Sequence, residues 1–187
     1  CPFASDEDAI VFTGAMDYWP NVDAVSWFVH DVLPAIVAVR PRARFYVVGM
    51  HPTAAVVALA NEPRVVVTGL VPDVRPYLRH ARVVVAPLRV ARGIQNKVLE
   101  AMAMARPVVV SATAAEGLSG MPGVDFEIAM DAQEFACKTV GLMDDPAATV
   151  IGTAARTRVV ADYAWTSNLA PFEALLDVPG CTRAVAA

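Results

Sequence analysis

The stretch that decides the fold is Gly93-Ile-Gln-Asn-Lys-Val-Leu-Glu-Ala-Met-Ala-Met-Ala-Arg-Pro-Val-Val-Val110. It predicts a loop, then a helix, then a buried strand. At helical spacing, Asn96, Lys97 and Glu100 share one face of the helix, and apolar side chains cover the other. In α/β sheets, a loop that leads into a helix N-terminus is a place where anions bind. The stretch therefore indicates an α/β domain with an anion site at the start of this helix.

Short valine-rich runs alternate with helical patterns on both sides of this stretch. Such alternation implies right-handed crossover connections and a parallel sheet. Thr53 is a predicted N-cap, and Pro34 should kink or divide the long helix that contains it. The predicted fold is α/β: a Rossmann-like, doubly wound parallel sheet of about six strands with helices on both faces. Strands are expected at residues 9–13, 44–48, 64–68, 82–86, 107–111 and 126–129, and helices at residues 21–39, 53–60, 73–80, 95–105, 131–143, 146–163 and 167–176.

The composition fits a single domain with a large core. Hydrophobic residues make up 56% of the 187 residues, and charged residues make up 18%. The many valines fit parallel strands that are covered on both faces. We expect the domain to span residues 9–177, between short tails at residues 1–8 and 178–187. The net charge of -4 gives no reason to expect binding to nucleic acid.

The cysteine pattern and the lack of an evident targeting signal favour a cytoplasmic protein. Cys1, Cys137 and Cys181 lie far apart and show neither metal-ligand spacing nor a disulfide framework. We therefore expect a reducing compartment and no metal site. No apolar run in the sequence approaches the roughly 18–20 residues of a membrane span, and no signal peptide is evident. The chain does not begin with Met, so we expect it to be a piece of a longer protein.

Three predicted strands end in glycine, at Gly14, Gly49 and Gly69. Glycine at the carboxyl edge of a sheet lets a ligand approach the backbone closely, and Gly14 is therefore a candidate binding residue. The alternative is that each glycine serves turn geometry. The residues alone leave both interpretations open.

Three cations, Arg89, Arg92 and Lys97, lie within nine residues at the predicted anion site. The helix dipole disfavours a cation in the first turn by about 0.3–1 kcal/mol, so Lys97 needs a partner. That partner is either Glu100, in an ordinary surface pair, or a bound anion such as a pyrophosphate. Such a cluster in an acidic chain favours the anion.

Two carboxylates complete the candidate site. Glu100 lies on the loop-facing side of the helix, where it can accept hydrogen bonds from a ribose diol, although a solvated glutamate is the simpler interpretation. Glu116 follows the next strand and either adds a second carboxylate to the same rim or belongs to a turn. His51 is the one histidine expected at this edge. The sequence has no G-x-S-x-G elbow, P-loop or G-x-G-x-x-G motif, so three common enzyme classes lack support.

Several motifs resemble the C-terminal domain of glycosyltransferase family 4, whose members have two Rossmann-like domains in the GT-B arrangement. The most specific is Lys97-Val-Leu-Glu-Ala-Met-Ala103. Met16-Asp-Tyr-Trp-Pro-Asn21 and Pro87-Leu-Arg-Val-Ala-Arg-Gly-Ile-Gln-Asn-Lys97 together resemble sugar transferases of bacterial exopolysaccharide and PEP-CTERM protein-sorting loci. Tyr163-Ala-Trp165 resembles a Tyr-Ser-Trp near the end of these domains.

The resemblance implies a binding site for a nucleotide-sugar donor, UDP- or GDP-linked, and no separate cofactor. In the family, the residue that matches Glu100 binds the ribose, and the loop that matches Leu70-Val71-Pro72 lies against the base. The segment that matches Gly93–Lys97, including Asn96, lies near the diphosphate and the sugar. Glu116 would lie near the ribose or the edge of the sugar.

The resemblance also implies a reaction and a missing partner. The reaction is transfer of a sugar to a glycan or lipid-linked acceptor with retention of configuration. The acceptor would bind to an N-terminal domain that this chain lacks, so the chain alone should be inactive. We expect a cytoplasmic enzyme, or one at the inner face of a membrane that carries its acceptor.

Two departures from the family pattern concern the donor. The family has a glutamate that contacts the donor sugar eight residues before the one at Glu100, and this chain has Arg92 there. The family also holds the diphosphate with Arg and Lys after the first strand, and Gly14-Ala-Met-Asp-Tyr-Trp19 supplies neither. Our hypothesis is that Arg89, Arg92 and Lys97 replace them from the other side of the cleft.

Three alternatives were considered. A nucleotide-sugar 2-epimerase shares the double-Rossmann architecture, and a non-catalytic scaffold domain of a polysaccharide assembly system would tolerate Arg92. A receiver domain needs an Asp after the third strand, where this chain has Val67-Thr-Gly-Leu70.

Overall fold

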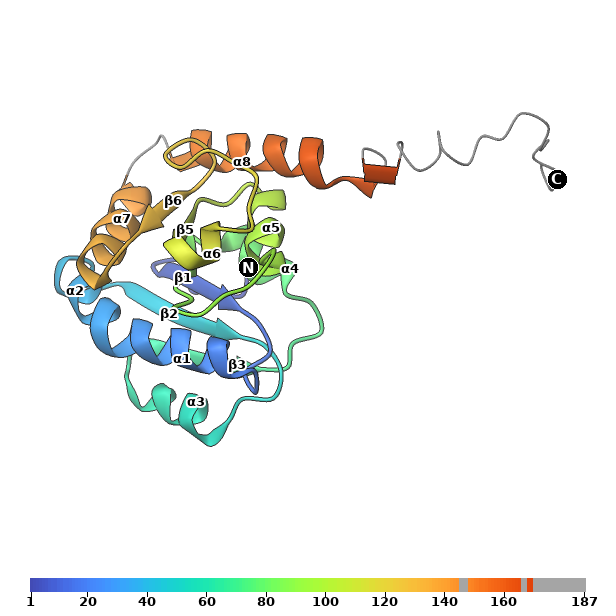
Figure 1. The fold of residues 1–187 in the computed structure, drawn as a ribbon. Coiled ribbons are helices and arrows are strands. Elements are labelled where there is room, and N and C mark those ends of the chain that lie inside the picture. The colour runs from blue at the N-terminus through green and yellow to red at the C-terminus, as the bar shows by residue number, and fades with distance from the viewer. Residues whose placement is uncertain (145–147, 166–167, 170–187) are drawn as a thin grey trace, which may run out of the picture.

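The computed structural model describes residues 1–144, 148–165 and 168–169. Its centre is a six-stranded parallel sheet in the order β3-β2-β1-β4-β5-β6 (Figure 1). The chain builds outward from β1 to one edge and then returns to the middle, so a switch point lies between β1 and β4. This arrangement confirms the predicted doubly wound, Rossmann-like sheet. The strands are β1 (Asp8–Thr13), β2 (Ala43–Val48), β3 (Val65–Gly69), β4 (Val83–Ala86), β5 (Val108–Ser111) and β6 (Glu127–Ala129).

Helices cover both faces of the sheet, as predicted (Figure 1). The helices α2 and α7 pack together on one face, and α4, α5 and α8 lie on the other. A short helix after β5, α6, was not predicted, because four residues carry too little periodicity to reveal a helix. The helices are α1 (Trp19–Trp27), α2 (Leu33–Val39), α3 (Ala54–Ala58), α4 (Arg75–His80), α5 (Asn96–Ala103), α6 (Ala112–Ala115), α7 (Ala132–Asp144) and α8 (Ala148–Tyr163).

The predicted strands agree with the observed ones to within one residue at each end. The predicted cap is also confirmed, because the Thr53 side chain accepts a hydrogen bond from the Val56 backbone N–H. The helix expected at residues 167–176 and the tail at residues 178–187 lie outside the described residues, apart from 168 and 169.

The first helical region runs from Trp19 to Val39 in three parts, with a π-helical turn at Phe28–Val32 between α1 and α2. Pro34 lies in the first turn of α2, directly after the π-helical turn, so the region changes its helical type at the predicted place. Contrary to the sequence analysis, this region is long and apolar enough, by length and composition alone, to cross a membrane. In the structure one side of this region is buried in the core of the domain, where Phe28 and Ile36 are fully buried, whereas Trp19 and Val39 at its two ends are exposed.

The segment before β1 packs against the domain. The Phe3 ring lies 4.5 Å from that of Tyr46 and 5.8 Å from that of Tyr77, centroid to centroid. Glu7 forms an ion pair with Arg44 of β2 at 2.7 Å. Residues 1–8 therefore contribute to the edge of the core, and their last residue opens β1.

The end of α5 is a tight packing point. Ala105 has a left-handed backbone, with φ of 55°, and Arg106 N–H donates to the Ala101 carbonyl at 3.1 Å. This is the Schellman type of helix ending. Helix α8 crosses here so closely that a Cβ on Gly152 would lie 2.3 Å from the Ala105 carbonyl oxygen. The crossing of α5 and α8 therefore requires glycine at position 152.

Candidate functional site

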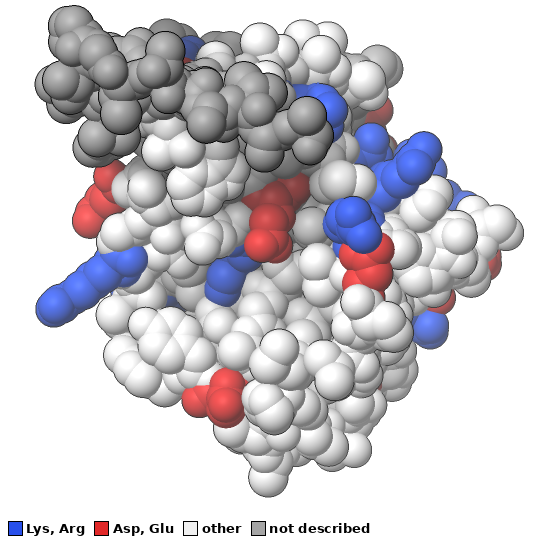
Figure 2. All heavy atoms as spheres, turned by 90° about the vertical axis from the view of Figure 1, so that its right-hand side faces the viewer, with Lys and Arg blue, Asp and Glu red and all other residues white. Residues whose placement is uncertain are grey.

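A cleft of about 460 Å³ opens at the carboxyl edge of the sheet, beside the switch point. The loops after β1, β2 and β3 form one wall, and the loop after β4 together with α5 forms the other. Figure 2 looks onto this edge and shows basic and acidic side chains meeting in a hollow, beside a broad uncharged surface. Predicted site residues that line the cleft are Gly14, Leu70, Val71, Arg92, Asn96, Lys97 and Glu100.

Lys97 reaches across the floor of the cleft from the first turn of α5. Its ammonium donates a hydrogen bond to the Oδ1 atom of Asn21 in α1, and it lies 4.3 Å from the centroid of the Phe12 ring in β1. No ion pair joins Lys97 to a carboxylate in the described parts of the chain. Burial lowers the Lys97 pKa to about 8, against a smaller opposing effect of Glu100. The structure thus shows no direct pair between Lys97 and Glu100, which acts on the ammonium only from a distance.

Glu100 lies one helical turn further along α5 and faces the same cleft. Its pKa is raised by burial, and the neighbouring Lys97 partly offsets this effect. Lys97 and Glu100 therefore line the cleft one after the other along α5, and their positions are about 4.5 Å apart along the helix axis.

The two arginines before α5 differ in position. Arg92 is exposed and lines the cleft. Arg89 Nε donates to the Asp23 carboxylate of α1 at 2.9 Å, and this contact raises the pKa of Arg89. Arg89 lies beside a neighbouring hollow, between the ends of β4, β5 and β6. The structure therefore brings Lys97 and Arg92 together at the cleft and holds Arg89 outside it.

The glycines at the strand ends are explained by close packing and turn geometry. A Cβ on Gly49 would lie 1.7 Å from the Gly14 carbonyl oxygen. A Cβ on Gly14 would lie 2.7 Å from Asn21 Nδ2 and 3.2 Å from Lys97 Nζ. Gly69 has φ of 66°, a left-handed conformation that suits a turn. Gly14 and Gly49 also line the cleft, so its floor there consists of main-chain atoms.

Gly93 and Glu116 lie beside the cleft, and neither is among the described residues that line it. A Cβ on Gly117 would lie 2.5 Å from the Gly93 carbonyl oxygen, so the loop after α6 packs directly on the loop before α5. Gly93 has φ of 64°, and Glu116 is exposed at the end of α6. Gly93 therefore allows the turn in the loop before α5, and Glu116 projects into solvent from the adjacent end of α6.

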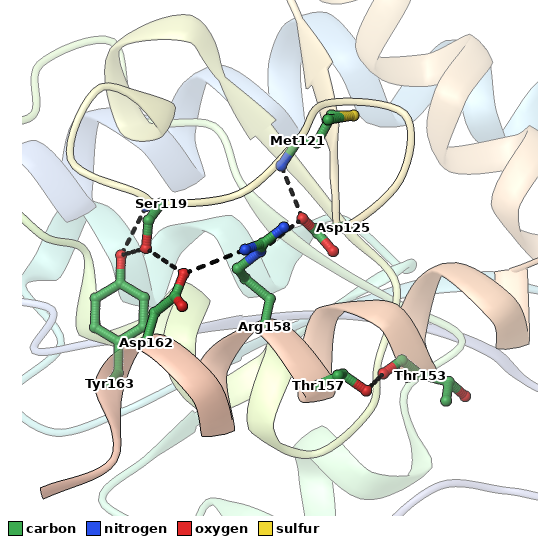
Figure 3. A network of polar contacts seen from close by, with 8 residues as sticks. All are labelled: Ser119, Met121, Asp125, Thr153, Thr157, Arg158, Asp162 and Tyr163. Atoms are coloured by element: carbon green, nitrogen blue, oxygen red, sulfur yellow. Dashed lines mark hydrogen bonds and ion pairs between the residues drawn. The ribbon is translucent and has the colours of Figure 1, made fainter. Parts of the chain in front are cut away.

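The loop after α6 is held from behind by α8 (Figure 3). Ser119 N–H donates to the Tyr163 hydroxyl at 2.7 Å. The Asp125 carboxylate accepts hydrogen bonds from Met121 N–H at 2.8 Å and from Arg158 Nε at 3.3 Å. Tyr163, the first residue of the Tyr-Ala-Trp motif, therefore anchors the loop that supports Gly93.

The main functional residue that the sequence analysis missed is Asn21. It is 5% exposed, and its Nδ2 donates to the Ala15 carbonyl at 2.8 Å while its Oδ1 accepts from Lys97. Its motif, Met16–Asn21, was noted only as part of a resemblance. Tyr18 and Met50 also line the cleft and were not predicted. A contact across 76 positions of the chain leaves no local signal in the sequence.

Histidines and metal ligands do not converge on the cleft in the described residues. His51 is exposed, has a left-handed backbone with φ of 54°, and does not line the cleft. No group of three or more His, Cys, Asp and Glu side chains within the described ranges could hold a metal ion.

Comparison with known proteins gave one family and many similar folds. A family model described as Glycosyl transferases group 1 matches residues 7–145. No curated protein sequence gave a significant match.

Several solved structures contain the same fold. TarM of S. aureus has a TM-score of 0.74 at 17% identity over 95% of this chain and 36% of its own. HepE of Anabaena, solved in complex with UDP and glucose, has a TM-score of 0.74 at 17% identity over 93% of this chain and 49% of its own. The sucrose-phosphate synthase of Thermosynechococcus elongatus has a TM-score of 0.72 at 22% identity, over 93% and 46%.

The chain spans between 36% and 49% of these structures. At such low identity the likeness establishes the fold, which is that of one half of a GT-B glycosyltransferase. The family model covers most of the chain, from the start of the sheet to the end of α7, and includes both motifs that meet in the cleft. The chain therefore belongs to the glycosyl transferases group 1 family.

Proposed function

We propose that this chain is the donor-binding half of a retaining glycosyltransferase of family 4. It would take a hexose from a UDP- or GDP-linked donor and pass it to a glycan or lipid-linked acceptor. The observation that carries this proposal is the unpaired ammonium of Lys97, which lies at the floor of the cleft where α5 begins. A partly buried cation without a carboxylate partner is costly for the fold, so its presence here favours an anionic ligand.

We place the donor in the cleft with its diphosphate at α5 and its base at the opposite wall. Its diphosphate would lie at the start of α5, where Lys97 and Arg92 add positive charge to the helix N-terminus. Its ribose would follow towards Glu100, whose carboxylate accepts hydrogen bonds from a diol. Its base would lie along the far wall at Leu70 and Val71, where one side chain is exposed and the other half-buried.

In this arrangement the protein acts mainly on the leaving group. When the sugar departs, negative charge develops on the diphosphate, and the nearby cations stabilise it. Lys97 is held in place before the reaction, so little reorganisation is needed. Arg92, which stands where the family has a sugar-contacting glutamate, would meet the donor near its phosphates. Because these side chains supply the positive charge, we propose that no cofactor is required besides the donor.

The rest of the enzyme lies outside this chain. The matched structures are two to three times as long, which supports a further domain that binds the acceptor. We propose that the chain alone binds the donor but does not transfer sugar, and that the complete enzyme works in the cytoplasm or at the inner membrane face, in exopolysaccharide synthesis. Sugar transfer by the purified chain on any donor and acceptor pair would contradict this assignment.

Calorimetry with UDP and GDP tests the donor site. We expect Lys97→Ala to weaken binding on the order of a hundredfold and Arg92→Ala about tenfold, because charge-assisted contacts to phosphate are lost. Arg89→Ala is the matched control from the same loop, since Asp23 already neutralises Arg89, and its affinity should stay within about twofold of the unchanged chain. The proposal fails if the unchanged chain binds neither nucleotide, or if both cleft variants bind as it does.

A further inference from the structure

Asn21 is buried in the first turn of α1, and both ends of its amide are used. The Nδ2 end donates to the Ala15 carbonyl at 2.8 Å, which fixes the loop after β1. The Oδ1 end accepts from the Lys97 ammonium. The amide therefore ties the loop after β1 to the first turn of α5, across the switch point of the sheet.

The groups in direct contact with the Lys97 ammonium are neutral. Phe12 faces it from β1, and Asn21 faces it from α1. Glu100, on the same helix as Lys97, is the one charged group in the described chain that influences the Lys97 pKa. The aromatic face and the amide oxygen attract the ammonium, but neither cancels its charge.

The choice of an amide at position 21 has a physical consequence. An aspartate of the same shape would accept the same hydrogen bond from Lys97 and neutralise the ammonium in an ion pair, but it would lose the bond that Asn21 Nδ2 donates to the Ala15 carbonyl. An apolar residue would leave the ammonium without a hydrogen-bond acceptor. An asparagine fixes the position of the cation and leaves its charge intact.

The ammonium held in this way faces open space at the cleft. The position that a Cβ on Gly14 would occupy is 3.2 Å from Lys97 Nζ and 2.7 Å from Asn21 Nδ2. Because Gly14 has no side chain, nothing from that residue covers the lysine. Gly14, Asn21 and Lys97 all line the cleft.

We propose that Asn21 is a positioning residue that holds the Lys97 ammonium at the floor of the cleft without neutralising it, so that the charge is available to the diphosphate of the donor. This inference rests on the proposed donor site and assigns a role to the Met16–Asn21 motif. It also gives a physical reason why this motif accompanies the Lys97 motif in one chain, since the two meet in a direct hydrogen bond.

The test compares Asn21→Asp with the unchanged chain, using UDP as the probe in calorimetry between about pH 7 and about pH 10. We expect Asn21→Asp to weaken UDP binding at least about tenfold at pH 7, because the new carboxylate neutralises Lys97 and repels the diphosphate. In the unchanged chain, affinity should fall as Lys97 loses its proton at alkaline pH. In the variant this fall should move to higher pH, because a carboxylate stabilises the ammonium.

Asn21→Ala, alone and combined with Lys97→Met, separates positioning from folding. Alone, Asn21→Ala should weaken UDP binding about fivefold or more, because the ammonium loses its fixed position. Combined with Lys97→Met, it should cause almost no further loss, which a double-mutant cycle measures as coupling. A purely structural role would lower the melting temperature of Asn21→Ala without producing this coupling and without moving the pH profile of Asn21→Asp.

The outcomes distinguish the inference from the function on which it rests. If the unchanged chain binds no UDP or GDP, the donor site itself is wrong. If it binds, but both Asn21 variants bind with the same affinity and the same pH profile as the unchanged chain, only the inference about Asn21 is overturned. If binding weakens with coupling to Lys97, and the pH profile moves as described, the inference stands.

Discussion

Two charged side chains of this domain, the buried Asp125 and the partly buried Lys97, lie in opposite electrostatic surroundings. The Asp125 carboxylate, on the loop that α8 supports, accepts hydrogen bonds from a backbone N–H and from Arg158 (Figure 3). The Lys97 ammonium, at the cleft, has a neutral amide and an aromatic ring. The charge on the supporting loop is thus paired inside the protein, whereas the charge at the cleft has no carboxylate in ion-pair contact within the described chain.

Removing the paired charge should have the largest effect on stability. Asp125→Ala leaves the Met121 N–H without its acceptor and Arg158 without its buried partner, so we expect a loss of about 2–3 kcal/mol in the free energy of unfolding. Urea denaturation measures it. Asp162→Ala is the control, because its contacts, with Arg158 at 3.6 Å and with the Ser119 hydroxyl at 3.0 Å, are partly exposed and should together contribute about 1 kcal/mol or less. Equal losses in the two variants would contradict the distinction drawn between buried and exposed partners.

The unpaired charge of Lys97 should make the free energy of unfolding depend on pH. The Lys97 pKa is lowered to about 8 in the folded chain, against an ordinary value of 10.5, so between these values the unfolded chain binds more protons. The stability of the unchanged chain should therefore rise with pH across this window, by on the order of 2 kcal/mol, relative to Lys97→Met. Below about pH 8 the difference between the two chains should stay constant. Urea denaturation of both proteins at several pH values measures it, and the subtraction removes the titration of all other groups. Parallel curves for the two proteins would show that Lys97 is not buried as a free charge.

The smallest effect is expected away from both charges, at the end of α5. Ala105 adopts a left-handed backbone that suits glycine better, so Ala105→Gly should raise the melting temperature and add about 0.5–1 kcal/mol to the free energy of unfolding. Ala103→Gly, at the last residue of the same helix, where the backbone is still right-handed, should instead lower the stability. Calorimetric melting of the two variants checks the opposite signs, and a loss of stability in both would refute the assignment of Ala105 as the helix end.

Most of the fold could be predicted from local patterns in the sequence. The strands β3, β4 and β5 were predictable because a short run of valines between turn residues is typical of a buried strand, as in Val83–Ala86 and Val108–Ser111. The α5 helix and its polar face were also predictable, because they depend on spacing within eight residues. The helix α6 was not, because its four residues are shorter than any periodicity can reveal.

The details of the site depended on contacts that no local pattern contains. Arg89 and Arg92 look equivalent in the sequence, and only the position of Asp23, 66 residues away along the chain, separates them. Lys97 was recognised as an unusual cation, but its true neighbour, Asn21, could not be identified without the crossing of the chain at the switch point. The location of the site and its positive charge could therefore be predicted from the sequence, but the contact between Lys97 and Asn21 could not.

The backbone contact between Gly14 and Gly49 limits how this cleft can be redesigned. A side chain at position 49 would overlap the Gly14 carbonyl oxygen at 1.7 Å, and one at position 14 would lie 2.7 Å from the Asn21 amide. The floor made of these two strand ends is consequently closed to mutation, and a protein engineer cannot introduce a new charge there. Changes to the charge of this cleft would have to be made on α5 and at position 21, the elements that meet at this floor.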